Sequence, residues 1–240
     1  MATIGDNLQG VIARIARAAA GAGRPPGSVR LLAASKTHPP ARIAEAYRAG
    51  QRAFGENYVQ EALEKMGALS QLLGQERARE LEWHLIGPLQ SNKTRAAAER
   101  FDWVQSVDRE KIARRLSEQR PAALAPLNVL IEVNLSGEAS KSGVAADGAA
   151  DLARAVAALP RLRLRGLMSV PAPRPDKAKQ RAAFRAVREL FERLRAQGLE
   201  LDTLSMGMSD DMEAAIEEGA TMVRIGSAIF GPREKVRSAA

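Results

Sequence analysis

Apolar residues along this chain follow two different spacings. In residues 4–15 they recur every three or four positions, which predicts an amphipathic helix that ends near Gly21. Short continuous apolar runs, the first of them VRLLAAS at 29–35, instead predict buried strands. The two patterns then alternate: further strands are predicted at 51–56, 80–87, 102–107, 127–137, 162–170, 201–205 and 221–226, and helices at 40–49, 57–74, 91–99, 108–119, 147–158, in a long segment ending at Gly198, and at 210–218.

This alternation predicts eight strand–helix units behind one leading helix. Strands joined through helices form a parallel sheet with right-handed crossovers, and eight units in about 210 residues fit a single TIM-type (β/α)8 barrel. No repeat or long linker divides the chain, so we expect one domain over 1–240, with the leading helix at 1–21 and the barrel at about 29–231. A doubly wound open sheet is the alternative, but no G-x-G-x-x-G follows the first predicted strand.

Composition removes several classes of function. The absence of cysteine excludes disulfides, thiolate metal sites and a cysteine nucleophile, and two histidines leave little for a metal site. No secretory signal or membrane span is visible, so we expect a cytoplasmic protein. A barrel of this size with no obvious extra apolar surface segment is expected to be mainly monomeric. The net charge of +8 suits a phosphate-bearing ligand, but only 4% of residues are aromatic and the arginines lie on polar helix faces, which argues against specific nucleic-acid binding.

In such a barrel the functional site collects where the strands end. The residues predicted there are Lys36, Glu56, Asn57, His84, Ser106, Asn134, Met168, Ser169, Ser205, Gly226 and Ser227. They include no carboxylate cluster suited to a metal. Taken alone, each has an ordinary alternative: Asn57 fits a helix N-cap, and His84, beside Trp83, fits a packed core histidine. Ser106 and Asn134 are equally ordinary at turns between strands and helices.

Arg224 and two turns are less ordinary. Arg224 lies inside the apolar strand MVRIG, where an unpaired guanidinium is costly, so it requires an internal acid such as Glu132 or a bound ligand. The turns LSMGMSDD (204–211) and RIGSAIFG (224–231) follow the last two predicted strands. That is the usual phosphate site of the fold, where backbone N–H groups are exposed.

Lys36 gives this site a reactive group. Apolar walls around a lysine lower its pKa, and the neutral amine can form an imine with an aldehyde. A lysine and a phosphate site in one barrel mouth predict an aldehyde that carries a phosphate. Pyridoxal 5′-phosphate and the sugar-phosphate substrate of a Schiff-base aldolase both meet that description.

Six segments of the sequence resemble one known family. They are SKTHPP (35–40), FGENYVQEALEK (54–65), WHLIGPLQSNK (83–93), NLSGEASKSGV (134–144), GLMSV (166–170) and LSMGMSDDMEAAIEEGATMVRIGSAIFG (204–231). Together they look like the pyridoxal-phosphate homeostasis proteins of the YggS/PROSC type. The resemblance implies the barrel found in the N-terminal domain of alanine racemases.

The resemblance also implies roles for individual residues. Lys36 would be the imine lysine, Asn57 would lie beside the cofactor ring, and Arg224 would face the pyridine nitrogen. Ser205, Met206, Gly226 and Ser227 would hold the phosphate, and His84, Met168 and Ser169 would line the pocket. Lys141 matches the family pattern without an assigned role.

The implied function is to hold pyridoxal phosphate as a Schiff base on Lys36 and to contribute to vitamin B6 homeostasis. No catalytic turnover is expected, and pyridoxal-phosphate-dependent enzymes are candidate client partners. Arg224 does not readily accept a proton, so the ring would be a poor electron sink. Racemases of this fold add a β domain and a second base, a tyrosine, whereas this sequence stops at Ala240 and its tyrosines are Tyr47 and Tyr58. A racemase-like or aldolase-like Schiff-base enzyme is the alternative.

Overall fold

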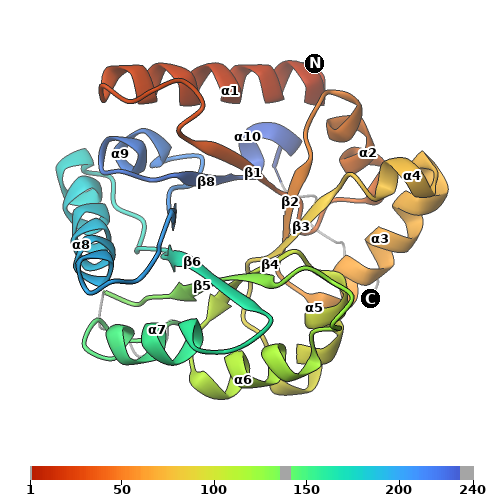
Figure 1. Ribbon diagram of the computed structural model, residues 1–240. Coiled ribbons are helices and arrows are strands. Elements are labelled where there is room, and N and C mark those ends of the chain that lie inside the picture. The colour runs from red at the N-terminus through yellow and green to blue at the C-terminus, as the bar shows by residue number, and fades with distance from the viewer. Residues whose placement is uncertain (1, 136–141, 233–240) are drawn as a thin grey trace, which may run out of the picture.

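The computed structural model describes residues 2–135 and 142–232, and within them the predicted barrel is confirmed. Parallel strands pair in chain order and close into a ring, as Figure 1 shows. The strands are β1 (Arg30–Ala34), β2 (Ala53–Glu56), β3 (Glu82–Leu85), β4 (Trp103–Val107), β5 (Leu127–Glu132), β6 (Leu162–Met168), β7 (Thr203–Ser205) and β8 (Met222–Ile225). Several are shorter than predicted, because the residues that follow them turn away to form the mouth of the barrel.

Helices surround the ring. They are α1 (Ile4–Gly21), α2 (Pro40–Arg48), α3 (Val59–Leu73), α4 (Gln75–Ala78), α5 (Thr94–Arg100) with the preceding 3₁₀ turn η1 (Ser91–Lys93), α6 (Glu110–Gln119), α7 (Ala149–Ala157), α8 (Lys177–Ala196), α9 (Met212–Glu217) and α10 (Ser227–Phe230). Within the described ranges, none is long and apolar enough to cross a membrane.

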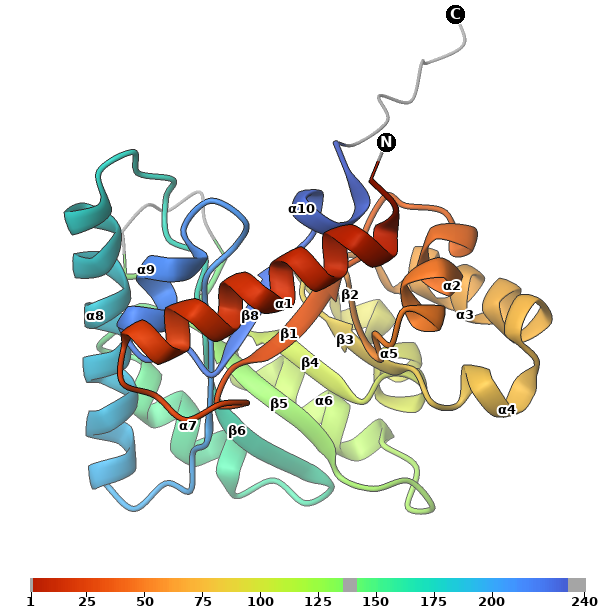
Figure 2. The ribbon, with the colours of Figure 1, turned by 90° about the horizontal axis from the view of Figure 1, so that it is seen from above.

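The leading helix α1 starts at a capping box. The Asp6 N–H donates to Thr3 Oγ1 at 3.1 Å, and the Thr3 N–H donates to Asp6 Oδ2 at 2.9 Å. These bonds satisfy backbone donors that the first helical turn leaves without partners. The helix lies outside the barrel, next to α9 and α10 (Figure 2).

Ring closure brings the two ends of the barrel sequence together. Strand β1 pairs with β8 so that Leu32 lies opposite Arg224 and Ala33 opposite Ile225. Lys36 follows β1 directly, and therefore the predicted reactive lysine and the buried arginine come from adjacent strands.

Candidate ligand-binding site

A cavity of about 790 Å³ opens at the carboxyl ends of the strands. Its wall comes from residues that follow or end seven strands, together with one face of α8. Polar lining residues include Lys36, Asn57, Glu132, Asn134, Ser169, Ser209, Arg224 and Ser227. Ile86, Val133 and Val187 supply apolar surface, so the cavity has the mixed lining of a small-molecule site.

The chain at Lys36 is held from both sides. The next residue, Thr37, adopts a positive φ of 68°, which is uncommon for a β-branched residue. Its N–H donates to Glu61 Oε1 at 2.9 Å, and Glu61 in turn pairs with Lys65 Nζ at 2.7 Å. Helix α3 therefore fixes the backbone immediately after Lys36.

A buried ion pair fixes the backbone immediately before it. Lys65 Nζ donates to the carbonyl of Ser35 at 3.0 Å and to Glu56 Oε2 at 2.9 Å, while Ser35 Oγ donates to Glu56 Oε1 at 2.6 Å. Burial raises the pKa of Glu56, and the charge of Lys65 opposes that rise. Because hydrogen bonds fix the backbone of both Ser35 and Thr37, the Lys36 side chain enters the cavity from a defined direction.

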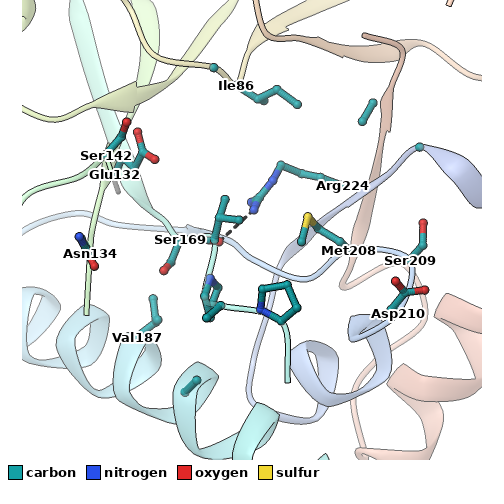
Figure 3. Close-up of a pocket in the computed structure, with 18 of the residues that line it drawn as sticks. Ile86, Glu132, Asn134, Ser142, Ser169, Val187, Met208, Ser209, Asp210 and Arg224 are labelled. Atoms are coloured by element: carbon teal, nitrogen blue, oxygen red, sulfur yellow. Dashed lines mark hydrogen bonds between the residues drawn. The ribbon is translucent and has the colours of Figure 1, made fainter. Parts of the chain in front are cut away.

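Arg224 points into the cavity from β8 (Figure 3). Its Nη1 donates to Ser205 Oγ at 2.8 Å and its Nη2 to the carbonyl of Ser169 at 2.9 Å. Burial lowers the pKa of Arg224 to about 10, although the charges of Glu132 and Asp211 oppose the change, so the side chain stays cationic at neutral pH. The predicted acid partner Glu132 thus acts through its charge, while the hydrogen bonds go to the two serines.

Glu132 ends β5 and faces the same cavity. Burial and the nearby charge of Asp108 raise its pKa to about 7, and Arg224 partly opposes this rise. Near neutral pH the carboxyl group therefore exists in both its protonated and its charged form.

The two predicted phosphate turns meet at the cavity wall. Ser227 Oγ donates to Ser209 Oγ at 3.3 Å, which places one hydroxyl from each turn side by side. The Met208 N–H donates to Asp211 Oδ1 at 2.6 Å and closes the first turn. Hydroxyl groups and glycine-rich backbone at this place suit the oxygens of a phosphate group.

Six of the ten residues predicted to contact the cofactor line the cavity wall: Lys36, Asn57, Ser169, Arg224, Gly226 and Ser227. Of the further residues predicted at strand ends, Asn134 lines it, whereas Glu56 and Ser106 do not. The position of Asn57 also depends on Gly87, where an added Cβ would come within 2.3 Å of the Asn57 carbonyl oxygen. Lys141 lies outside the described residues.

The other four, Ser205, Met206, His84 and Met168, are buried in the barrel and do not line the cavity, contrary to the sequence-based expectation. Met206 lies in the main hydrophobic core and Met168 packs with Trp103 and Leu130. Ser205 accepts a hydrogen bond from Arg224 on the side away from the cavity. The predicted turn 204–211 reaches the wall through Met208, Ser209 and Asp210, because Gly207, with φ of 95°, redirects the chain.

His84 occupies the position of a packed core histidine, the alternative that the sequence had left open. Its Nδ1 lies 2.9 Å from Gln105 Nε2, and its ring stacks on Trp103 with centroids 5.1 Å apart. Burial lowers the pKa of His84, although Glu82 opposes the change.

Comparison with known proteins identifies the family. The model of the alanine racemase N-terminal domain matches residues 7–234. The pyridoxal phosphate homeostasis protein of Pseudomonas aeruginosa is 60% identical over 98% of this chain and 97% of its own length. The protein of the same name from Escherichia coli is 54% identical over 98% of both chains. This chain belongs to the pyridoxal phosphate homeostasis protein family.

Solved structures place the family in a wider group of barrels. PipY of Synechococcus elongatus, known with pyridoxal phosphate bound, superposes with a TM-score of 0.77 at 38% identity and covers 90% of this chain and 100% of its own. An alanine racemase from Clostridium difficile shares the fold with a TM-score of 0.71 at 13% identity, and this chain spans 58% of its length. The homeostasis protein family and the racemase therefore share one barrel.

Proposed function

We propose that this protein binds pyridoxal 5′-phosphate, holds it through Lys36, and contributes to the homeostasis of that cofactor. The observation that carries the proposal is that one cavity gathers Lys36, the cationic Arg224 and the Ser209–Ser227 pair. The relatives' names and the cofactor bound to PipY support the same ligand.

Each part of the cavity fits one part of this ligand. When bound, pyridoxal phosphate supplies an aldehyde, which condenses with a primary amine to give a Schiff base and water. Lys36 offers the amine at the mouth of the barrel, and Ser209, Gly226 and Ser227 offer donors for the phosphate. Arg224 lines the cavity and is held by two hydrogen bonds, and a guanidinium has five N–H donors, so it can also donate to the ring nitrogen.

We further propose that the protein holds the cofactor without catalytic turnover. A cationic arginine does not readily protonate the ring nitrogen, so the bound ring stays a poor electron sink. Within the described ranges the cavity wall includes no tyrosine: the Tyr47 hydroxyl donates to Glu80 at 2.9 Å, and Tyr58 is 64% exposed outside the lining. The tyrosine that serves as the second base in racemases of this fold is thus not among the described lining residues. Enzymes that depend on the cofactor are the candidate partners.

The test is to identify the covalent bond. Purified protein is mixed with pyridoxal phosphate, its absorption is recorded, the adduct is reduced with borohydride, and the modified peptide is mapped by mass spectrometry. We expect modification at Lys36, loss of the Schiff-base absorption in Lys36→Ala, and no change in Lys111→Ala, which removes an exposed lysine on α6. Unchanged absorption in Lys36→Ala would refute the assignment.

A second measurement addresses the enzyme alternative. Loaded protein is incubated with an excess of single-enantiomer amino acids and with sugar phosphates, and the products are followed over many equivalents. We expect no multiple turnover. Sustained racemisation or carbon–carbon cleavage that is lost in Lys36→Ala would instead establish an enzyme.

A further inference from the structure

Helix α1 lies against both turns that form the phosphate side of the cavity. It runs along the outside of the barrel from α9 to α10 (Figure 2), and its packing fixes it there. The residues that it buries are Ile4, Leu8, Val11, Ile15 and Ala19. The helix therefore lies beside two short segments, the loop that follows β7 and the helical turn α10 that follows β8.

Two polar side chains connect α1 to these segments. Asn7 Nδ2 donates to the carbonyl of Ile229 at 3.0 Å, and Arg14 Nη2 donates to the carbonyl of Ser209 at 3.2 Å. Seven residues separate Asn7 from Arg14, which is about two helical turns, so both lie on the same face. Glu213 orients the arginine through a bond of 3.0 Å between Arg14 Nε and Glu213 Oε1.

These bonds extend to the hydroxyls at the cavity. The Ile229 N–H donates to the carbonyl of Gly226 at 2.9 Å, so a fixed Ile229 also fixes the turn that carries Ser227. Arg14 contacts the backbone of Ser209 itself. The two backbone segments that carry these hydroxyls, whose oxygens lie 3.3 Å apart, are therefore both anchored to one helix.

We propose that Asn7 and Arg14 are positioning residues that hold Ser209 and Ser227 at the separation a phosphate monoester requires, an inference that rests on the proposed function. Within the described part of the chain, neither side chain lines the cavity, so neither touches the ligand. Their loss changes recognition of the phosphate group and leaves the aldehyde and ring contacts in place. Discrimination between pyridoxal phosphate and pyridoxal, which lacks only the phosphate, then depends on residues outside the site.

The experiment compares these two ligands. Dissociation constants of the full-length protein are measured by absorbance titration for Asn7→Ala, Arg14→Met and the double variant. We expect the double variant to bind pyridoxal phosphate about five- to tenfold more weakly and pyridoxal within about twofold of the unchanged protein, since each lost bond contributes modestly. Arg17→Met is the matched control, because Arg17 is exposed on α1 and has no hydrogen bond or ion pair to the described residues.

The outcomes separate this inference from the proposed function. An unchanged ratio of the two dissociation constants in the double variant would overturn the positioning role, and so would equal weakening of both ligands. If the unchanged protein fails to prefer pyridoxal phosphate over pyridoxal, the proposed phosphate site itself is wrong. If the double variant does not fold, the milder Arg14→Lys variant is compared by competition with inorganic phosphate, where weaker phosphate binding is expected and unaltered binding refutes the role.

Discussion

Arg224 Nη1 donates a hydrogen bond of 2.8 Å to Ser205 Oγ, and both side chains are buried in the barrel. Ser205 Oγ donates in turn to Gln105 Oε1 at 2.7 Å, and Gln105 Nε2 lies 2.9 Å from His84 Nδ1. A polar chain therefore runs from the barrel interior to the guanidinium at the cavity. Ser205 and His84, both expected at the cofactor, belong instead to the buried polar chain that ends at Arg224.

Removal of the Ser205 hydroxyl breaks this chain. In Ser205→Ala the Arg224 donor and the Gln105 acceptor both lose a buried partner, and we expect a loss of about 1–3 kcal/mol in the free energy of unfolding. Urea denaturation measures it. Ser70→Ala is the control, because that hydroxyl bonds the Met66 carbonyl on α3, away from the cavity. Equal stability of the two variants would show that the chain does not stabilise the fold.

Lys65 neutralises a buried carboxylate behind Lys36. In Lys65→Met the charge of Glu56 remains buried without its cation, so we expect a loss of about 3–5 kcal/mol in the free energy of unfolding. The double variant Lys65→Met/Glu56→Gln should regain part of this loss, because the fully buried charge at position 56 is gone, while the more exposed Glu61 still lacks its cation. A double variant that is no more stable than the single variant would contradict this account.

Glu132 makes the stability of the ligand-free protein depend on pH. Its pKa in the folded state, about 7, lies above the ordinary value of 4.5, so the folded protein binds this proton more tightly than the unfolded chain. This contribution to stability is complete below about pH 4.5 and is lost as the pH rises through 7. As the pH rises from 5 to 8, the free energy of unfolding of Glu132→Gln should therefore increase by about 2 kcal/mol relative to that of the unchanged protein. Chemical denaturation across this range measures the difference in the free energy of unfolding. A difference that does not change with pH would contradict the prediction.

Two glycine substitutions should act in opposite directions. In Gly87→Ala the added Cβ would lie 2.3 Å from the Asn57 carbonyl oxygen, so the backbone beside the cavity must shift. We expect lower thermal stability and weaker binding of pyridoxal phosphate. Gly67 lies within α3 with nothing within 4 Å of an added Cβ, and Gly67→Ala should stabilise by about 0.5–1 kcal/mol. Thermal melts compare the stability of the two variants. If Gly87→Ala melted at the same temperature as the unchanged protein, the contact would be easily relieved.

The sequence predicted the barrel because each buried strand and each amphipathic helix leaves a local pattern. Arg224 was identifiable for the same reason, since a charge within an apolar strand needs a partner. Within the predicted turn 204–211, the sequence did not show which residues reach the cavity, because the backbone rotation at Gly207 is not visible in the apolar pattern.

The supporting contacts could not be predicted in this way. The bond from Arg14 to Ser209 joins residues 195 positions apart, and the pair Glu56–Lys65 joins a strand to the next helix. Such pairs depend on how separate elements pack. In the sequence, Arg14, Glu56 and Lys65 do not differ from ordinary surface charges. The residues that hold the site in place were therefore harder to find than those that line it.

The pairing of β1 with β8 also sets an order of events during protein synthesis. Lys36 leaves the ribosome early, whereas Arg224 and Ser227 follow only after nearly all of the chain has been made. Until then β1 lacks one neighbour, and the side of the cavity that β8 forms does not exist. A nascent chain can therefore expose Lys36 but cannot enclose the cavity, which requires both ends of the barrel sequence.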